Sequence, residues 1–310
     1  MIVSFDRLAQ GIRRKENPTV VGLDPNLRHI PDCIKSASFD KIADPLSAAA
    51  DAVLRFNRGI IDAVWDIVPA VKPQCAYYER LGWPGMRALA ETIAYAHEKG
   101  LFVITDGKRG DIGPTMEAYA AAHLGRTEIG GREAEPFGAD ALTVNGYLGT
   151  DGIAPLLPVC REEDKGIFVL VRTSNPSAGE IQDRLIDDEP LYERMGRLCE
   201  QWSERAAGVP VTGYGCVGAV VGATWSRQLG GLRRKLPHTF FLVPGYGAQG
   251  AGAADIAGAF DAGGGGAVVN SSRAILYAYE KEGGDGREYA GAARRAALRM
   301  KEEIGRVWPH

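Results

Sequence analysis

Residues 101–115 read LFVITDGKRGDIGPT, an apolar run followed directly by two carboxylates and a lysine. A short continuous apolar run is typical of a strand that is buried on both faces, as in a parallel sheet. The predicted strand covers Leu101 to Asp106, so Asp106, Lys108 and Asp111 stand at its carboxyl end or just beyond it. In α/β barrels this end of the strands carries the active site.

Seven further runs of the same character recur along the chain, and longer stretches with helical periodicity separate them. This alternation predicts parallel strands joined by crossover helices. With eight such units the predicted fold is a TIM (β/α)8 barrel of the α/β class, formed as a single domain by residues 1–310. The other predicted strands are Thr19 to Leu23, Ala70 to Lys72, Ala141 to Val144, Ile167 to Arg172, Val217 to Val221, Phe240 to Pro244 and Ala267 to Asn270.

Three connecting segments have a pattern of their own. Apolar residues at helical spacing predict a long helix from Pro45 to Val68, with Asp44 as its N-cap and proline at its first position. The polar, glycine-bearing stretch from Arg126 to Gly138 predicts a loop before the fourth strand. The stretch from Gly286 to Val307 is rich in alanine, arginine and glutamate, which predicts a closing helix. No low-complexity linker divides the chain.

Composition narrows the class of protein. The formal charge of -3 over 310 residues gives no global basic signature for nucleic acid, and no segment approaches the length of a membrane span. The N-terminus lacks the apolar run of a signal peptide. Five scattered cysteines, without a CxxC pair, predict reduced thiols and no structural zinc. We therefore expect a soluble, cytoplasmic protein that acts on a small molecule and binds neither nucleic acid nor membrane.

Charged residues gather at the predicted strand ends. Side chains two apart on a strand share a face, so Asp106 and Lys108 can both point into the barrel mouth, whereas Arg109 should face the other way and pair behind the site. Lys72 ends the second strand, and Asp106 next to it could supply the partner that a buried lysine needs. From spacing alone, a solvated charged loop and a lysine that reaches the rim remain alternatives.

Two glycine- or serine-rich segments follow the last two strands. PGYGAQG, residues 244–250, and NSSR, residues 270–273, occupy the positions at which such barrels commonly bind phosphate. Glycines let backbone N–H groups approach an anion, and Arg273 can form paired bonds to phosphate oxygens. The two loops together indicate a phosphate site.

The ordered set GLDPN, AVKPQ, DGKRGDI, RTSNPS, VPGYGAQG and NSSR resembles the orotidine 5′-phosphate decarboxylases, in their longer bacterial branch. The resemblance extends from about Asp24 to Arg273. It implies conversion of orotidine 5′-phosphate (OMP) to UMP and carbon dioxide, the last step of de novo pyrimidine nucleotide biosynthesis, without cofactor or metal. It also implies a homodimer whose active sites are completed across the interface.

The resemblance also assigns roles to particular residues. The implied catalytic network is Lys72, Asp106, Lys108 and Asp111, with Asp111 contributed by the partner subunit. Lys108 would stabilise the carbanion at C6 and protonate it. The implied substrate contacts are Asp24 and Lys72 at the ribose, Ser174 at the pyrimidine ring, Ile112 and Thr115 from across the interface, and Gln249 and Arg273 at the phosphate. Pro244 and Ser272 are further implied substrate contacts.

Two alternatives stay open at this point. One is a metal-dependent sugar-phosphate barrel, such as a 3-keto-gulonate-phosphate decarboxylase or a hexulose-phosphate synthase, which shares the DxKxxD pattern. The other is a non-catalytic relative that senses UMP, although a binding module has little need for so much buried charge. Four tryptophans, Trp65, Trp83, Trp202 and Trp225, are expected only to pack in the core or at an interface.

Overall fold

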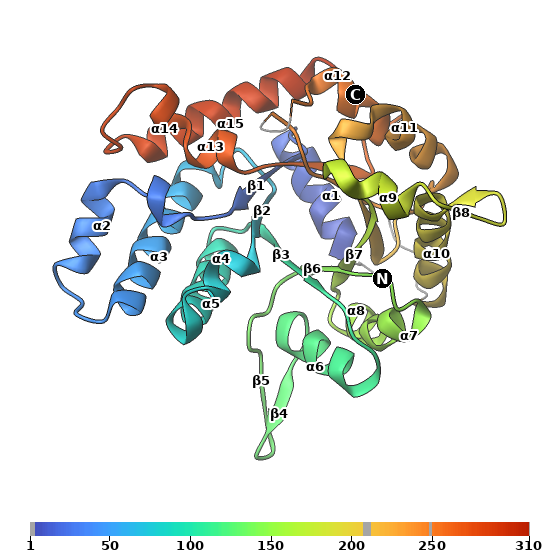
Figure 1. Ribbon diagram of the computed structural model, residues 1–310, viewed down its shortest axis with the longest axis horizontal. Coiled ribbons are helices and arrows are strands. Elements are labelled where there is room, and N and C mark those ends of the chain that lie inside the picture. Colours follow the sequence, from blue (N-terminus) through green and yellow to red (C-terminus); the bar gives the residue numbers. More distant parts are fainter. Residues whose placement is uncertain (1–3, 207–211, 248–249, 310) are drawn as a thin grey trace.

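Eight parallel strands close into a barrel in a computed structural model, which describes residues 4–206, 212–247 and 250–309 (Figure 1). Their order around the barrel is β1, β12, β11, β10, β7, β6, β3, β2 and back to β1. The strands are β1 (Thr19–Leu23), β2 (Ala70–Pro73), β3 (Phe102–Arg109), β6 (Ala141–Val144), β7 (Gly166–Arg172), β10 (Val217–Val221), β11 (Phe241–Val243) and β12 (Ala267–Ser271). This confirms the predicted α/β barrel, with each strand on one of the eight apolar runs.

The strands bury both faces, which explains why their sequences are apolar throughout. Alternate residues point into the barrel, where Val20, Ala70, Ile104 and Phe168 belong to one buried cluster. The intervening residues, such as Val21, belong to a second cluster formed with the surrounding helices. The period of two along each strand therefore decides which side chains can reach the centre of the barrel.

Helices surround the barrel and also close one of its ends. Phe5, Leu8, Ala9 and Ile12 of α1 are packed with the inward residues of the strands, so α1, which lies at the centre of Figure 1, plugs the barrel at the amino ends of the strands. The helices are α1 (Ser4–Lys15), α2 (Asp32–Phe39), α3 (Pro45–Val64), α4 (Cys75–Glu79), α5 (Gly82–Glu98), α6 (Gly113–His123), α7 (Thr150–Ile153), α8 (Leu157–Glu162), α9 (Gly179–Gln182), α10 (Leu191–Ala206), α11 (Ser226–Lys235), α12 (Ala253–Ile256), α13 (Arg273–Leu276), α14 (Ala278–Lys281) and α15 (Tyr289–Gly305).

Two of the helix predictions hold closely. Asp44 caps α3, with its carboxylate accepting from the Ser47 N–H, and Pro45 occupies the first position. The helix ends at Val64 and a turn follows, so the predicted end at Val68 was four residues too late. The predicted C-terminal helix is α15, which packs with α3, α13 and α14.

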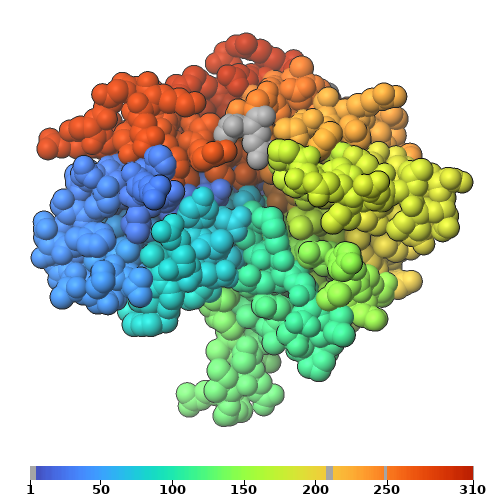
Figure 2. Space-filling model, viewed as in Figure 1, coloured from blue at the N-terminus to red at the C-terminus, as the bar shows by residue number. Residues whose placement is uncertain are grey.

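The predicted loop from Arg126 to Gly138 was wrong, because it contains an antiparallel hairpin. Strands β4 (Thr127–Ile129) and β5 (Arg132–Ala134) pair with Ile129 opposite Arg132. Both turn residues, Gly130 and Gly131, have positive φ, as the two-residue hairpin turn requires. The hairpin extends away from the barrel in the ribbon and space-filling views (Figures 1 and 2). A second short hairpin joins β8 (Leu185–Ile186) and β9 (Glu189–Pro190).

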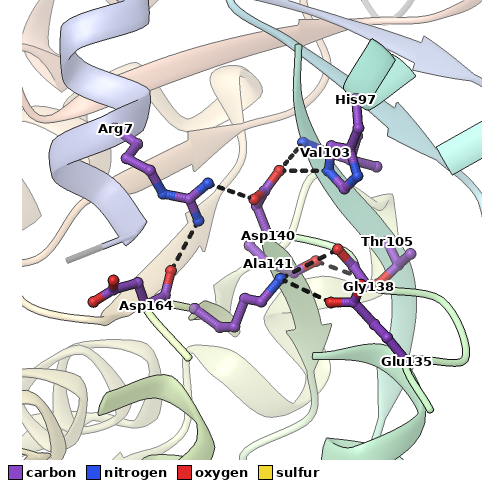
Figure 3. A network of polar contacts seen from close by, with 10 residues as sticks. Arg7, His97, Val103, Thr105, Glu135, Gly138, Asp140, Ala141 and Asp164 are labelled. Carbon is purple, nitrogen blue, oxygen red and sulfur yellow. Dashed lines mark hydrogen bonds and ion pairs between the residues drawn. The ribbon is translucent and has the colours of Figure 1, made fainter. Parts of the chain in front are cut away.

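A buried carboxylate holds several elements together at the amino end of β6 (Figure 3). Asp140 lies 2.9 Å from Arg7 Nη1 and 3.0 Å from His97 Nε2, and it accepts from the Val103 N–H at 2.8 Å. Burial would raise the pKa of Asp140, but its contacts with His97, Arg7 and Val103 lower it. Asp140 thus fixes β6 against β3, the strand that carries Asp106 and Lys108.

The remaining expectations concern the tryptophans, the cysteines and the absence of a membrane-spanning segment. Trp202 is buried and donates to Thr150, as expected for a packing role, whereas Trp65 and Trp83 are 43% and 72% exposed in the single chain. Cysteines 33, 75, 160, 199 and 216 are free thiols. Over the described ranges, no helix has the length and apolar character needed to span a bilayer.

Candidate active site

The inward-facing positions change from apolar to polar toward the carboxyl ends of the strands. Two residues after inward Ala70, Ile104, Ala141 and Val268 stand Lys72, Asp106, Thr143 and Asn270. All four polar residues are buried, with at most 7% of their surface exposed. Because buried polar groups are costly unless they are paired, a polar layer in this place indicates a site rather than a core.

Asp106 is the centre of this layer. Its Oδ2 accepts from Lys72 Nζ at 2.6 Å and from Gln74 Nε2 at 3.0 Å. Its Oδ1 accepts from Lys108 Nζ at 2.6 Å and from Thr143 Oγ1 at 2.9 Å. Four donors on one carboxylate fix both lysines in place, and this confirms the predicted meeting of Lys72 with Asp106.

The charges of this cluster stabilise one another. Burial would raise the pKa of Asp106, but the charges of Lys72 and Lys108 and their hydrogen bonds outweigh it and lower the pKa well below its usual range. Burial would likewise lower the pKa of Lys72, but the charges of Asp106 and Asp24 raise it. Both groups are therefore ionised near neutral pH, and the site keeps a fixed array of alternating charge.

Lys108 reaches Asp106 through an irregular backbone rather than through a regular strand. The pairing of β3 with β6 shifts register between Thr105 and Arg109, and Lys108 has φ 46°. A non-glycine residue with positive φ is uncommon and clusters at functional sites. The Lys108 N–H donates to Thr143 Oγ1 at 2.9 Å, so the same threonine supports both the backbone and the carboxylate partner of the lysine.

Arg109 faces away from the cluster, as predicted. Its guanidinium forms an ion pair with Glu79 of α4 and lies 5.5 Å from the ring centroid of Tyr119 on α6. The charge of Arg109 is therefore neutralised behind the site, whereas the ammonium groups of Lys72 and Lys108 both contact Asp106.

Asp111 does not join the cluster within one chain. Its Oδ1 accepts from the Ile112 N–H at 2.8 Å, and across the described ranges it forms no ion pair with Lys72 or Lys108. Ile112 is 51% exposed, and Thr115 on α6 is also exposed. These three predicted site residues lie on one surface segment, which follows β3 and includes the first turn of α6.

The ends of β1 and β12 form a second polar region around a glycine. A Cβ on Gly22 would lie 1.9 Å from Ser272 Oγ and 3.1 Å from Asn270 Oδ1, so only glycine fits there. Asn270 Oδ1 and Asp24 Oδ1 are both buried, and neither has a hydrogen-bond partner among the described residues. Unsatisfied buried acceptors of this kind are available to a ligand that carries hydroxyl donors.

The predicted phosphate contacts lie beside this region. Arg273 is the first residue of α13 and is exposed, and no ion pair holds its guanidinium within the described part of the chain. Pro244 follows β11, and its carbonyl accepts from the Ala223 N–H at 2.9 Å. Gly245 and Gly247 have φ 100° and 74°. Gln249, the other predicted contact, lies outside the described residues.

Sequence reasoning missed three polar residues of this site. Thr143 has the residue type of an ordinary strand former, although its position two after Ala141 places it inside the barrel. Gln74 directly follows β2, and Asn270 was taken only as part of the NSSR segment. In each case the period of two from an inward apolar residue is the signal that could have found the side chain.

Comparisons with known proteins identify relatives of the whole chain. Residues 44–284 match the model of the "Orotidine 5'-phosphate decarboxylase / HUMPS family". A Rhodopirellula baltica protein named orotidine 5′-phosphate decarboxylase is 44% identical over 308 residues, which is 98% of this chain and 99% of that one. A Clostridium novyi protein of the same name is 38% identical over 99% of this chain and 100% of its own. The structure of Leishmania donovani OMP decarboxylase has a TM-score of 0.71 and 28% identity, covering 97% of this chain and 99% of that one.

Proposed function

The chain belongs to the orotidine 5′-phosphate decarboxylase / HUMPS family, and from this premise we propose how it converts OMP to UMP and carbon dioxide. The observation that carries the proposal is the array in which Asp106 holds Lys72 and Lys108 at 2.6 Å each. This reaction belongs to pyrimidine nucleotide biosynthesis.

Decarboxylation of OMP requires a fixed positive charge beside C6 of the pyrimidine ring. When the bond between C6 and the carboxylate breaks, its electron pair stays in an sp² orbital that the pyrimidine ring cannot delocalise. Lys108 is the cation we place there, because its side chain is 46% exposed at the barrel mouth whereas that of Lys72 is 5% exposed and lies deeper. A charge already held in position stabilises the developing carbanion without reorganisation.

Lys108 then acts as the acid. One ammonium proton of Lys108 moves to C6, which completes UMP, and the neutral amine takes a proton from solvent. Asp106 remains ionised throughout, because its four hydrogen-bond donors stabilise the charged form. Its role is to position Lys108, whose ammonium group donates to Asp106 Oδ1 at 2.6 Å.

The remaining contacts bind three parts of the substrate: the ribose, the pyrimidine ring and the phosphate. Asp24 and Lys72 bind the ribose hydroxyls, and the partnerless buried Oδ1 of Asp24 supports this. Ser174, which follows β7, bonds the pyrimidine ring. We assign the phosphate to the segments that follow β11 and β12, with Arg273 as its main cation, and keep Pro244, Gln249 and Ser272 as proposed substrate contacts.

We also propose that Asp111, Ile112 and Thr115 complete the site of a second copy of the chain in a homodimer. Support comes from the position of these residues at the surface and from the absence of an ion pair between Asp111 and either site lysine within the described residues. In the dimer, Asp111 would extend the alternating charges of the partner's barrel.

Mixing two inactive variants tests the composite site. Lys108→Ala removes a catalytic group from the active site in its own barrel, whereas Asp111→Asn removes a group from the active site in the partner's barrel. In a mixed dimer one site therefore regains both groups, and random mixing restores about one quarter of the sites. The check is OMP turnover before and after the two variants are unfolded and refolded together.

The matched control mixes Lys108→Ala with Asp106→Asn. Both residues belong to the barrel of their own chain, so each site of a mixed dimer lacks one of them and no site is intact. Recovery only in the Asp111→Asn mixture supports the composite site. If neither mixture recovers although mixed dimers form, Asp111 acts within its own chain or not at all.

The alternatives are less consistent with the geometry. A divalent cation at Asp106 would have to displace or approach two ammonium groups that already contact both carboxylate oxygens. A UMP sensor would gain little from the buried charges of this array. Incubation of the purified protein with OMP, followed by ultraviolet absorbance and identification of UMP, decides between them: a sensor binds UMP tightly but leaves OMP unchanged.

A further inference from the structure

Arg172, the last residue of β7, is fully buried, and the proposed mechanism does not use it. Its guanidinium lies 4.0 Å from the ring centroid of Trp225 and 5.2 Å from that of Tyr192. Its Nη2 donates to Asp183 Oδ2 at 3.2 Å, and its Nη1 lies 2.9 Å from Asp183 Oδ1 without hydrogen-bond geometry.

The contribution of Arg172 to the stability of the fold does not by itself explain why an arginine is buried at this position. Its Nε is buried and, among the described residues, has no acceptor, and its partner Asp183 is 48% exposed. An apolar residue of similar volume is often as stabilising as a buried ion pair, because it avoids the desolvation of the charges. A buried arginine with incomplete hydrogen bonding therefore indicates that Arg172 is needed to hold neighbouring groups in position.

The residues around Arg172 hold the backbone that follows it. The indole Nε1–H of Trp225, in the 3-10 turn Ala223–Trp225, donates to the Thr173 carbonyl at 2.8 Å. Gln182 accepts from the Thr173 N–H at 3.0 Å, and its Nε2 donates to Thr173 Oγ1 at 2.7 Å. Thr173 is thus fixed through both its backbone groups and its side chain.

The opposite side of this segment is covered by Gly222, which directly follows β10. The Gly222 N–H donates to the Arg172 carbonyl at 2.7 Å. A Cβ on Gly222 would lie 2.9 to 3.0 Å from the Cβ, Cα and N of Ser174, so the glycine backbone packs directly on that serine. Ser174 is therefore enclosed between Thr173, which Trp225 holds, and Gly222.

We propose that Arg172 and Trp225 are positioning residues, which hold Ser174 where it bonds the pyrimidine ring. Arg172 fixes the plane of the indole by stacking on it, and the indole N–H fixes the residue before Ser174. This inference rests on the proposed function through the assignment of Ser174 to the ring. It gives Trp225, expected from the sequence only to pack, a part in substrate recognition.

The test uses Trp225→Phe, which keeps an aromatic ring for the arginine and removes the N–H donor, and Arg172→Met, which keeps length and removes charge. Each variant is expected to lower kcat/KM for OMP by about 10-fold to 100-fold, because small displacements of a positioning group are costly. Binding of UMP should weaken, whereas binding of ribose 5-phosphate, which has no pyrimidine, should not change.

A double-mutant cycle with Ser174→Ala separates positioning from general damage. If Trp225 acts through Ser174, Trp225→Phe has little further effect once Ser174 is alanine. Trp65→Phe, at an exposed tryptophan, is the matched control and should behave as the wild type.

Equal loss of UMP and ribose 5-phosphate binding, or an undiminished effect of Trp225→Phe in the Ser174→Ala background, would overturn the proposal. If Arg172→Met does not fold, Trp225→Phe alone decides. Should the wild type fail to decarboxylate OMP, the proposed function is wrong, and the two binding measurements still decide whether Trp225 and Ser174 recognise a pyrimidine.

Discussion

Replacing Lys108 with alanine is expected to lower kcat for OMP decarboxylation on the order of 10⁴-fold or more, because in the proposed mechanism Lys108 is both the cation and the proton donor at C6. UMP binding survives, since Asp24, Ser174 and Arg273 remain. The measurement is loss of OMP absorbance at saturating substrate, with UMP affinity determined separately by calorimetry.

Two further variants serve as controls for the Lys108→Ala measurement. Lys108→Met retains the length of the side chain and should be as inactive as the alanine variant, which excludes loss of packing as the cause. Lys41→Ala, at an exposed lysine outside the barrel, should match the wild type. A Lys108→Ala enzyme within about 10-fold of the wild-type kcat would contradict the role of this lysine as acid.

We expect the replacement of Arg273 with alanine to lower kcat/KM for OMP by about 10² to 10³-fold, although the proposed function assigns Arg273 to the phosphate and not to the bond that breaks. Binding energy from a non-reacting phosphate can be used to order the site and to exclude water from it. The exposed guanidinium of Arg273, without an ion pair in the described part of the chain, is available for this contact.

The nucleoside orotidine provides the decisive comparison, because it lacks the phosphate. Its slow decarboxylation should be unaffected by Arg273→Ala, so the effect of the change should be confined to OMP. Arg306→Ala, at the exposed residue that follows α15 and pairs with Glu302, is the matched control. Equal losses with OMP and orotidine would show that Arg273 supports the fold and not the phosphate.

The barrel could be predicted because strands buried on both faces must be apolar throughout. TVVGL, ALTV and VGAVV coincide residue for residue with β1, β6 and β10. The hairpin of β4 and β5 escaped prediction because its strands are mostly polar and exposed, so no apolar alternation marks them. Its only sequence signal is the Gly130–Gly131 pair at the turn.

The site could be predicted where it depends on strand ends, and not where it depends on local irregularity. Lys72 and Asp106 follow from the period of two along regular strands. The positive φ of Lys108 and its support by Thr143 arise from a register shift that no periodicity reveals. The stacking of Arg172 on Trp225 and the hydrogen bond from Trp225 to Thr173 depend on the packing of residues more than 50 positions apart, which the sequence does not reveal.

The most direct test of the central claim, that fixed lysine and aspartate charges suffice for the reaction, is OMP turnover after exhaustive EDTA treatment. We expect rapid loss of OMP absorbance with UMP as product, unchanged when Mg²⁺ is added back. Loss of turnover with EDTA and its recovery with Mg²⁺ would contradict the proposed mechanism and favour the metal-dependent branch of these barrels.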